Sequence, residues 1–480
     1  MKFIAVDVRR IILFICLAFA FTANAEPRKT NLLFILSDNH GAWTLGCYGN
    51  KEIRTPNIDR LAADGMLFTR AYCANPVCSP SRATFLTGLM PSQHGVHSYL
   101  PADKQNSPSG PEACVINEFA NLPKILSGAG YNCGLVGKWH LGGSLQPQQG
   151  FTYWLTKSGG HTTTFCGDEM VWQGKIYRET NYTTDVIASH AVKFLEQYGD
   201  KPFFLYLPFN APYGLGNVVL QPHTNRHAAY YADKNMDSFP RAPVHPSQTG
   251  NRAAMNNVTA MRSYAAAVSG LDDGMGRVLE TLRRLNLETN TLVVFAGDQG
   301  LSGGHGGFWG IGDHARPVNV REEVTRIPLI FRLPGKIIAG KKSDLMVGNY
   351  DFLPTVLDVL GMNAATPTNP PSPGKSFAPA LTGKTIPWGD AIFHEYENTR
   401  MIRTKNWKLT LRSPKGPAEL YDMQRDPDEQ QNLIADAAHV AEKEKLTKRL
   451  NDFFAKYADP KYDLWRGGIS KARRVTGAAK

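Results

Sequence analysis

The chain has 480 residues, of which 42% are hydrophobic and 20% charged, and its formal net charge is +11 at pH 7. This length exceeds what one compact core usually holds, so we expect one large domain and a smaller one. The positive charge suits an anionic substrate, but the sequence has no dense lysine or arginine block and no nucleic-acid-binding motif, which argues against a nucleic-acid partner.

The first residues, Met1–Ala25, predict a signal peptide. Arg9 and Arg10 precede the apolar run Ile11–Phe21, and Ala23–Ala25 has the small-x-small pattern of a cleavage site. The alternative is an N-terminal membrane anchor, but the run is short for a membrane span and no stop-transfer flank follows it. We therefore expect an exported protein, periplasmic or secreted, without stable membrane insertion.

Six cysteines follow the predicted signal peptide. Some could pair in an exported protein, but sequence alone selects no disulfide connectivity. They are Cys47, Cys73, Cys78, Cys114, Cys133 and Cys166.

Short apolar runs alternate with helical patterns along the chain. The runs predict parallel strands buried on both faces, at Asn31–Ser37, Tyr131–Val136, Pro202–Leu207 and Thr291–Ala296. The helical patterns cover Thr55–Gly65, Thr184–Tyr198 and Met261–Leu282. The alternation predicts an α/β fold with a large mixed, mostly parallel sheet sandwiched by helices.

Polar residues follow three of the predicted strands, where ligands gather in open α/β sheets. Lys138 and His140 follow the second run. The first and fourth runs are followed by four oxygen-bearing side chains, Asp38, Asn39, Asp298 and Gln299. Such oxygens suit a hard cation, Ca²⁺ or Mg²⁺. The same residue pairs are also common in turns and caps, and spacing alone leaves both interpretations open.

The segment Cys78–Gly88, CSPSRATFLTG, contains a Cys-x-Pro-x-Arg core and a Thr-Gly end. Ser79–Leu86 can form a helix with Pro80 in its first turn, which places Cys78 at a helix end that favours anions. The segment resembles the signature of the type I, formylglycine-dependent sulfatases of the alkaline phosphatase superfamily. Further landmarks of that family stand in order at Asp38–Asn39, Leu45–Gly49, Thr55–Asp59, Gly137–Gly142, Asp298–Gly300 and Arg326–Pro328.

The last part of the chain also resembles this family. Met401–Thr404, Trp407–Lys408 and Glu419–Asp422 are similar to its C-terminal subdomain, a small antiparallel sheet closed by a helix that is expected here at Val440–Phe454. The resemblance implies a catalytic domain over residues 26–385 and this subdomain over residues 386–480.

The resemblance implies a sulfuric ester hydrolase acting on an anionic sulfated substrate, for which we expect a sulfated carbohydrate. Asp38, Asn39, Asp298 and Gln299 would hold Ca²⁺, with Mg²⁺ as the alternative ion. A maturing enzyme would convert Cys78 to formylglycine, whose hydrated aldehyde attacks sulfur. By the same resemblance Arg82 steadies the diol, Lys138 bridges diol and sulfate, and His140 takes the proton that collapses the intermediate.

Two positions depart from the family pattern. Tyr213 follows Pro212 where the family has a histidine that contacts sulfate, and Ile311 stands where a sulfate-binding lysine is expected. The group that protonates the leaving oxygen is therefore unassigned. Tyr213, His305, His314 and Arg316 are nearby in sequence, and we expect Tyr213, His314 and Arg316 to bind substrate.

Other interpretations remain open at this stage. Cys78 is also readable as an ordinary buried thiol, and Lys138 and His140 as a salt-bridge partner and a turn histidine. Alternative functions are a formylglycine-dependent phosphodiester or phosphonate monoester hydrolase and a non-catalytic relative that binds sulfated glycans. The irregular segment Gly214–Arg252 is either a substrate lip, ordinary packing or a subunit contact.

Overall fold

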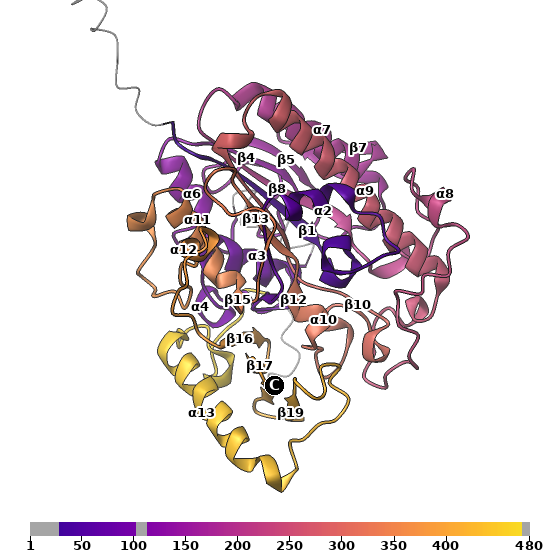
Figure 1. The fold of residues 1–480 in the computed structure, drawn as a ribbon, viewed down its shortest axis with the longest axis vertical. Coiled ribbons are helices and arrows are strands. Elements are labelled where there is room, and N and C mark those ends of the chain that lie inside the picture. Colours follow the sequence, from indigo (N-terminus) through magenta and orange to yellow (C-terminus); the bar gives the residue numbers. More distant parts are fainter. Residues whose placement is uncertain (1–27, 102–112, 473–480) are drawn as a thin grey trace, which may run out of the picture.

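A ten-stranded sheet forms the centre of the computed structural model, which describes residues 28–101 and 113–472 (Figure 1). The predicted signal peptide, residues 1–25, lies outside these residues. The strands follow one another across the sheet in the order β14 (Lys341–Ser343), β2 (Met66–Phe68), β13 (Leu329–Arg332), β9 (Thr291–Gly297), β1 (Asn31–Asp38), β8 (Phe203–Pro212), β4 (Asn132–Gly137), β5 (Tyr153–Lys157), β6 (Cys166–Trp172) and β7 (Lys175–Tyr182).

The four predicted strands are β1, β4, β8 and β9, and they are parallel to one another at the centre of the sheet. Their side chains alternate between two cores, as the period of a strand requires. Leu33 and Ile35 of β1 enter one core, and Leu32, Phe34 and Leu36 enter the other. The sheet is mixed because β6, β7 and β13 pair antiparallel to their neighbours.

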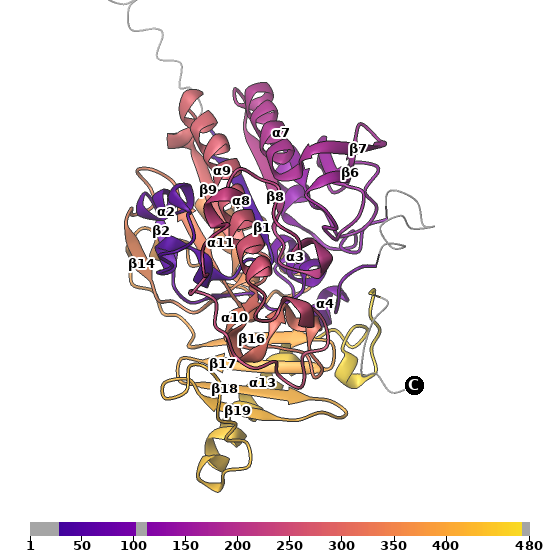
Figure 2. The same cartoon turned by 90° about the vertical axis from the view of Figure 1, so that its right-hand side faces the viewer.

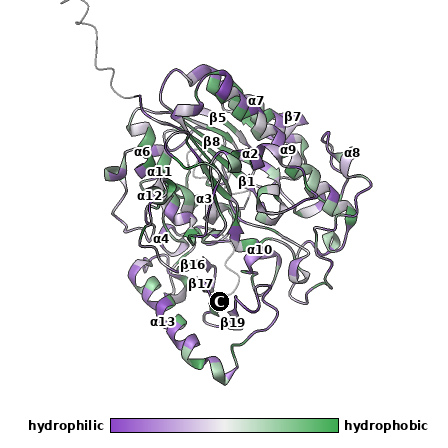
Figure 3. Cartoon of the chain, viewed as in Figure 1, coloured by the Kyte–Doolittle hydropathy of each residue, from purple (hydrophilic) through white to green (hydrophobic). Residues whose placement is uncertain are grey.

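Helices cover both faces of the sheet. Helices α2, α7 and α9 pack on the core that contains Ile35, while α3, α6 and α11 pack on the core that contains Phe34. Figure 3 shows both hydrophobic and hydrophilic positions along α7 and α9, as expected for helices with one buried face. The helices are α2 (Pro56–Ala63), α3 (Cys78–Thr87), α4 (Pro91–His94), α6 (Leu122–Gly128), α7 (Thr183–Tyr198), α8 (Ala228–Tyr231), α9 (Val258–Arg284), α10 (Glu322–Thr325), α11 (Phe352–Val359), α12 (Ala378–Leu381) and α13 (Val440–Tyr457).

A separate four-stranded antiparallel sheet follows near the C-terminal end (Figure 2). Its strands are β16 (Ala391–Tyr396), β17 (Thr399–Thr404), β18 (Trp407–Arg412) and β19 (Glu419–Asp422). Helix α13 packs on this sheet through Leu446, Leu450 and Phe454, which recur every four residues. The α/β fold with a smaller C-terminal antiparallel sheet is therefore confirmed.

Two small strand groups complete the fold. They are the pair β10 (Ser302–Gly303) and β11 (Trp309–Gly310), and the sheet β12 (Arg326–Ile327), β3 (Ala71–Tyr72) and β15 (Val347–Gly348).

The segment after α3 is tied to the C-terminal part of the chain. The Ser92 amide donates to Glu395 of β16 at 2.7 Å, and His97 Nε2 donates to the Tyr462 carbonyl at 2.8 Å. Arg400 of β17 bonds both Glu395, at 2.9 Å, and Asp463, at 2.6 Å, in a buried cluster. The helix that begins at Cys78 thus continues into a segment held by residues far along the chain.

None of the described helices is both long enough and apolar enough to cross a membrane. The six cysteines after the predicted signal peptide are all free thiols.

Candidate active site

Five neighbouring strands end at one edge of the central sheet. Strands β9, β1, β8, β4 and β5 are adjacent and parallel, so their carboxyl ends lie at the same edge. This edge is where open α/β sheets bind ligands. The predicted residues at Asp38, Lys138 and Asp298 follow three of these strands and come together there.

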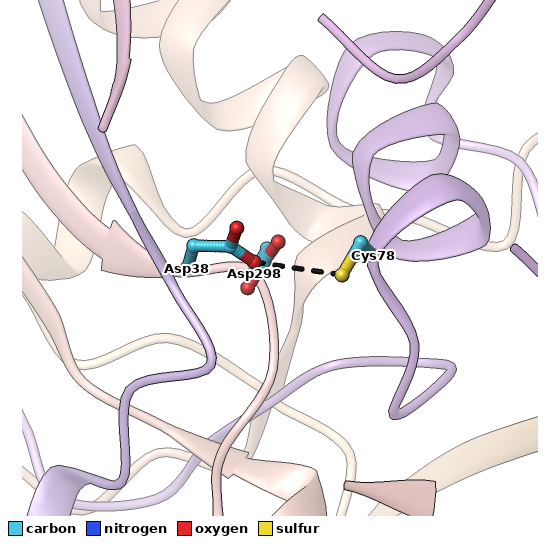
Figure 4. A group of neighbouring side chains, drawn as sticks. All are labelled: Asp38, Cys78 and Asp298. Carbon is cyan, nitrogen blue, oxygen red and sulfur yellow. Dashed lines mark hydrogen bonds between the residues drawn. The ribbon is translucent and has the colours of Figure 1, made fainter. Parts of the chain in front are cut away.

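Cys78 is the first residue of α3 and faces Asp38 and Asp298 (Figure 4). Val77 before it is extended, so the helix begins at the cysteine, one residue before the predicted start at Ser79. The Cys78 Sγ lies 3.4 Å from Asp38 Oδ1, 3.7 Å from Asn39 Oδ1 and 3.2 Å from Gln299 Nε2. All four predicted metal ligands are therefore grouped beside the predicted nucleophile.

Burial sets the protonation state of this thiol. Cys78 is only 2% exposed, and burial raises its pKa, an effect that the nearby Lys138 charge opposes. The thiol is therefore protonated at neutral pH and is a poor nucleophile as it stands, because the thiolate is the reactive form.

Arg82 and Lys138 neutralise the two carboxylates. The Arg82 guanidinium donates to Asp298 Oδ2 from Nη2 at 2.8 Å and from Nε at 3.1 Å. Lys138 Nζ donates to Asp38 Oδ2 at 2.8 Å, and Arg82 Nη1 donates to the Lys138 carbonyl at 2.7 Å. All four side chains are fully buried, so each charge depends on its partner.

The donor set fits a hard cation. Burial and then the Asp38 charge raise the pKa of Asp298 to about 6, which is the effect expected of two carboxylates crowded together. The side-chain amides of Asn39 and Gln299 contact each other, and Gln299 Oε1 is buried with no hydrogen-bond partner among the described residues. Two carboxylates and two amides offer the oxygen atoms that Ca²⁺ or Mg²⁺ requires.

His140 lies beside this group with a neutral ring. Its pKa is well below the usual range because of burial and then the Lys138 charge. Nε2 donates to the Leu100 carbonyl at 3.0 Å, so Nδ1 carries the free lone pair, and Nδ1 has no partner among the described residues. His140 also has a left-handed backbone, with φ of 58°, a conformation that is uncommon outside glycine.

A cavity of about 790 Å³ opens in front of Cys78. We use the name loop wall for these residues that line it: His161, Tyr213, Leu215, Asn217, Asn251, His314 and Arg316. We call the buried group behind and around the cysteine the motif wall, and it consists of Asp38, Asn39, Cys78, Arg82, Lys138, Asp298 and Gln299. Of the motif wall, Cys78 is the residue that lines the cavity.

The three predicted substrate-binding residues all line this cavity. His314 Nδ1 pairs with Asp313 Oδ1 at 2.9 Å, and this pairing outweighs burial to hold the pKa of Asp313 below its usual value. Arg316 Nη1 donates to the carbonyls of Asp313 and Ala315. Ile311, which stands where the family has lysine, is an apolar part of the same cavity.

The segment Gly214–Arg252 reaches the cavity at both of its ends. Leu215 and Asn217 lie at one end of it, and Thr249 and Asn251 at the other. Its ends are thus placed where a substrate lip would lie.

His161 is a cavity residue that the sequence analysis did not identify. It follows β5, a strand that was not among the predicted ones, and its Nδ1 lies 2.9 Å from the Tyr213 hydroxyl. The aromatic run Tyr153–Trp154 before a glycine-containing turn was the available signal. Read as a strand, that run would have drawn attention to the polar residues after it.

Two family models match this chain. The model described as sulfatase matches residues 30–362, and the model for the C-terminal region of N-sulphoglucosamine sulphohydrolase matches residues 315–456.

Characterised relatives cover most of the chain. It is 28% identical over 515 residues to an N-acetylglucosamine-6-O-sulfatase of Bacteroides thetaiotaomicron, with 90% of this chain and 88% of the relative covered. It is 30% identical over 444 residues to the N-acetylgalactosamine-6-sulfatase of Sus scrofa, with 84% and 76% covered.

Solved structures also match over most of the chain. A protein bound to its substrate D-glucosamine-2-N,6-O-disulfate is 25% identical, with a TM-score of 0.71 over 90% of this chain and 98% of that chain. The phosphonate monoester hydrolase of Agrobacterium radiobacter has a TM-score of 0.68 over 90% and 97% but is 20% identical, a likeness of fold alone.

Proposed function

The chain belongs to the sulfatase family of the alkaline phosphatase superfamily and is a sulfate ester hydrolase, and from this premise we propose that it acts on a sulfated carbohydrate through a formylglycine made from Cys78. The observation that carries the proposal is the contact of Cys78 with Asp38, Asn39 and Gln299 at the mouth of a cavity.

Formylglycine resolves the poor reactivity of the cysteine. When formed, it supplies a hydrated aldehyde with a hydroxyl that attacks sulfur, which a protonated buried thiol cannot do. The first turn of α3 places that hydroxyl at a helix N-terminus, where an anion is stabilised. The modification requires a formylglycine-generating or sulfatase-maturing enzyme as a partner.

Ca²⁺ is the cation we propose for the motif wall, held by Asp38, Asn39, Asp298 and Gln299. When bound, it supplies positive charge that offsets the charge of the ester. Two observations support this assignment. Gln299 Oε1 has no partner among the described residues, and a cation would bind it. The pKa of Asp298 is raised, and a cation would stabilise its charged form. Mg²⁺ is the alternative, and its demand for a strict octahedron with bound waters makes it less suited to a packed set of four side chains.

The remaining side chains divide the other tasks. Arg82 holds Asp298 and faces Asp38 at 3.7 Å, so it keeps the two carboxylates in position for the cation. Lys138 places a second positive charge beside Asp38 and within reach of the cavity. His140, neutral and with a free Nδ1, is suited to accept the proton that is released when the intermediate collapses.

The substrate we propose is the sulfate ester of a glycosaminoglycan or related carbohydrate. The two relatives described above act on 6-sulfated amino sugars by name. The cavity of about 790 Å³ lies in the range of small-ligand sites. Arg316 and His314 add cationic or hydrogen-bonding groups for an anionic glycan.

The organisation of the chain follows from the same proposal. We propose a catalytic domain over residues 26–385 and a C-terminal subdomain over residues 386–480, in a protein exported by the signal peptide at residues 1–25. The anionic substrate of such an enzyme is then met in the periplasm or outside the cell.

One observation favours a second candidate. Tyr213 and Ile311 remove a histidine and a lysine that would face sulfate, and a less positive cavity suits a phosphodiester or phosphonate monoester. A non-catalytic relative that binds sulfated glycans is the third candidate, and the complete motif wall argues against it.

Mass spectrometry of the tryptic peptide Ala71–Arg82 tests the nucleophile directly. The protein is made in a host that forms formylglycine, and we expect the aldehyde at Cys78 and an unchanged thiol at Cys73 in the same peptide. An unmodified Cys78, in a host that converts a control sulfatase, contradicts the proposal. Turnover of 4-nitrophenyl sulfate against bis(4-nitrophenyl) phosphate then separates the first two candidates.

A further inference from the structure

The loop wall contains a tyrosine–histidine pair that lines the same cavity as the nucleophile. His161 Nδ1 and the Tyr213 hydroxyl are 2.9 Å apart, and both residues line the cavity together with Cys78. His161 is exposed there, whereas Tyr213 is 5% exposed. A substrate bound at Cys78 therefore meets the imidazole edge of this pair.

The His161 loop is positioned by close packing on His140. A Cβ on Gly160 would lie 2.1 Å from His140 Cδ2, so only glycine allows the loop to approach this closely. The rings of His161 and His140 then stand edge to face with centroids 5.4 Å apart, and Tyr99 packs on the other side at 5.2 Å. Sequence and packing thus fix where His161 stands relative to His140.

Tyr213 is fixed in turn to the metal-binding strand. Its amide donates to the Asp38 carbonyl at 3.0 Å, and its ring lies 5.4 Å from Lys138 Nζ. Among the described residues, His161 Nδ1 is the acceptor within hydrogen-bond distance of the Tyr213 hydroxyl, and Tyr213 is buried. The hydroxyl proton is therefore donated to His161 Nδ1, because a buried hydroxyl proton without an acceptor is costly.

This hydrogen bond selects the tautomer of His161. With Nδ1 accepting from Tyr213, the ring proton resides on Nε2. The ring is neutral because surrounding protein and then the Lys138 charge lower its pKa to about 4. Nε2 has no partner among the described residues, so its N–H is available to a ligand in the cavity.

The leaving group has to lie on this side. In a displacement at sulfur the attacking and leaving oxygens are roughly in line. The attacking group stands at Cys78, and the side chains behind it, Asp38, Arg82 and Asp298, are fully buried. The departing oxygen and its sugar therefore point into the cavity, toward the loop wall.

We propose that His161 donates a hydrogen bond from Nε2–H to the leaving oxygen of the ester, and that Tyr213 positions it by fixing its tautomer. This inference rests on the proposed sulfatase function and names the group that takes over the leaving-group side where the family histidine is absent. The hydrogen bond strengthens as the S–O bond breaks, because its electron pair passes to that oxygen. His314 is the other cavity histidine, but its Nδ1 pairs with a carboxylate, that of Asp313, which draws the ring proton to Nδ1 and leaves Nε2 of a neutral ring without an N–H.

The test uses leaving groups of different quality that share a phenyl ring. Phenyl sulfate leaves as a poor, basic oxyanion, whereas 4-nitrophenyl sulfate leaves readily and needs little assistance. We expect His161→Ala to lower kcat on phenyl sulfate about 10²- to 10³-fold, the cost of one lost oxyanion donor. On 4-nitrophenyl sulfate we expect a loss below about tenfold.

Two further variants address the geometry. His161→Gln keeps an N–H donor near the Nε2 position and should recover part of the loss on phenyl sulfate. Tyr213→Phe leaves the donor but frees its tautomer, so we expect a loss of about 10- to 100-fold, again larger for phenyl sulfate.

His190→Ala is the matched control. His190 Nδ1 lies 2.9 Å from the Tyr153 hydroxyl in a similar tyrosine–histidine pair, but the pair is on α7 and β5 outside the cavity. We expect the rate of this variant on each ester to equal that of the unchanged enzyme on the same ester.

Each outcome bears on a different claim. Equal losses on both esters in His161→Ala, with the fold intact by circular dichroism, overturn the leaving-group role of His161. If the unchanged, formylglycine-containing enzyme converts neither the two aryl sulfates nor a sulfated amino sugar, the sulfatase proposal itself fails. A larger loss on phenyl sulfate supports both.

Discussion

The two walls of the cavity differ in how they are built. The motif wall comes from the ends of central strands and the start of α3, and its six side chains other than Cys78 are fully buried. The loop wall comes from the segments after β5 and β8 and from residues near 251 and 314, and its side chains range from buried to exposed.

This difference teaches which part of the reaction the fold dictates. Buried charges on a rigid sheet have one arrangement, because each has to meet its partner. Residues on loops at the same site can be substituted without loss of the fold. Their identities can therefore be selected to suit a particular leaving group. Four substitutions test this contrast.

The largest effect is expected at the nucleophile. Cys78→Ala should lower kcat about 10⁶-fold, because no other described side chain replaces the lost hydroxyl. The measurement is turnover of 4-nitrophenyl sulfate. Cys73→Ala removes another buried thiol from the same peptide and should retain activity with about 1 kcal/mol less stability. Comparable activity losses in both variants would contradict the role of Cys78.

Arg82→Gln tests whether the motif wall depends on charge pairing. It leaves the buried Asp298 without its charged partner, whereas Asp38 keeps Lys138, so we expect the free energy of unfolding to fall by about 3–5 kcal/mol. Urea unfolding in EDTA measures this loss, and excess Ca²⁺ should restore part of it by binding the folded state. A loss unaffected by Ca²⁺ would argue against a cation among these carboxylates.

Low pH should destabilise the segment Gly214–Arg252, which contributes residues to the loop wall. His223 belongs to the segment between the two ends that line the cavity, and it bonds the Tyr182 hydroxyl at 2.9 Å. Burial and then His227 lower its pKa to about 4 from 6.5. The folded state thus binds fewer protons than the unfolded state between these values, so stability falls as pH decreases through this window.

The expected loss from His223 is about 3 kcal/mol between pH 7 and pH 4. His223→Gln should reduce the pH dependence of the free energy of unfolding, measured by urea titration at each pH, by that amount. Identical pH dependence in both proteins would show that His223 is not the neutral group inferred from its burial.

The smallest effect is expected at the cavity surface. Arg316→Gln removes a cationic donor from the loop wall, so KM for a sulfated amino sugar should rise about 10- to 100-fold, the equivalent of one charged hydrogen bond. Because Arg316 is only half-buried, its loss should change the free energy of unfolding by less than about 0.5 kcal/mol. A fall in stability as large as that of Arg82→Gln would remove the contrast between the walls.

The centre of the fold was predictable from the sequence because strands buried on both faces require apolar side chains at nearly every position. Strands β1, β4, β8 and β9 are buried on both faces and therefore read as apolar runs. Strand β7 pairs at the edge, and most of its residues are partly or fully exposed, so it has no such run. The order of strands depends on pairing between distant segments, which local patterns do not encode.

The same distinction applies to the candidate site. Asp38, Lys138 and Asp298 were identifiable because each directly follows a recognisable strand. His161 follows a short strand that was not predicted, and its importance depends on Tyr213, 52 residues away. The roles of all these residues remain predictions until the substitutions above are made.

The hydrogen bonds between the segment after α3 and the C-terminal residues form late in synthesis of the chain. His97 bonds the carbonyl of a residue 365 positions later. At ribosomal speeds of about 5–20 residues per second, the partner is made about 20–70 s after the histidine. During that interval the segment that follows α3 lacks the hydrogen bond to Tyr462 that holds it in the folded protein. If another enzyme oxidises Cys78, this delay is the period in which that enzyme can still reach the cysteine.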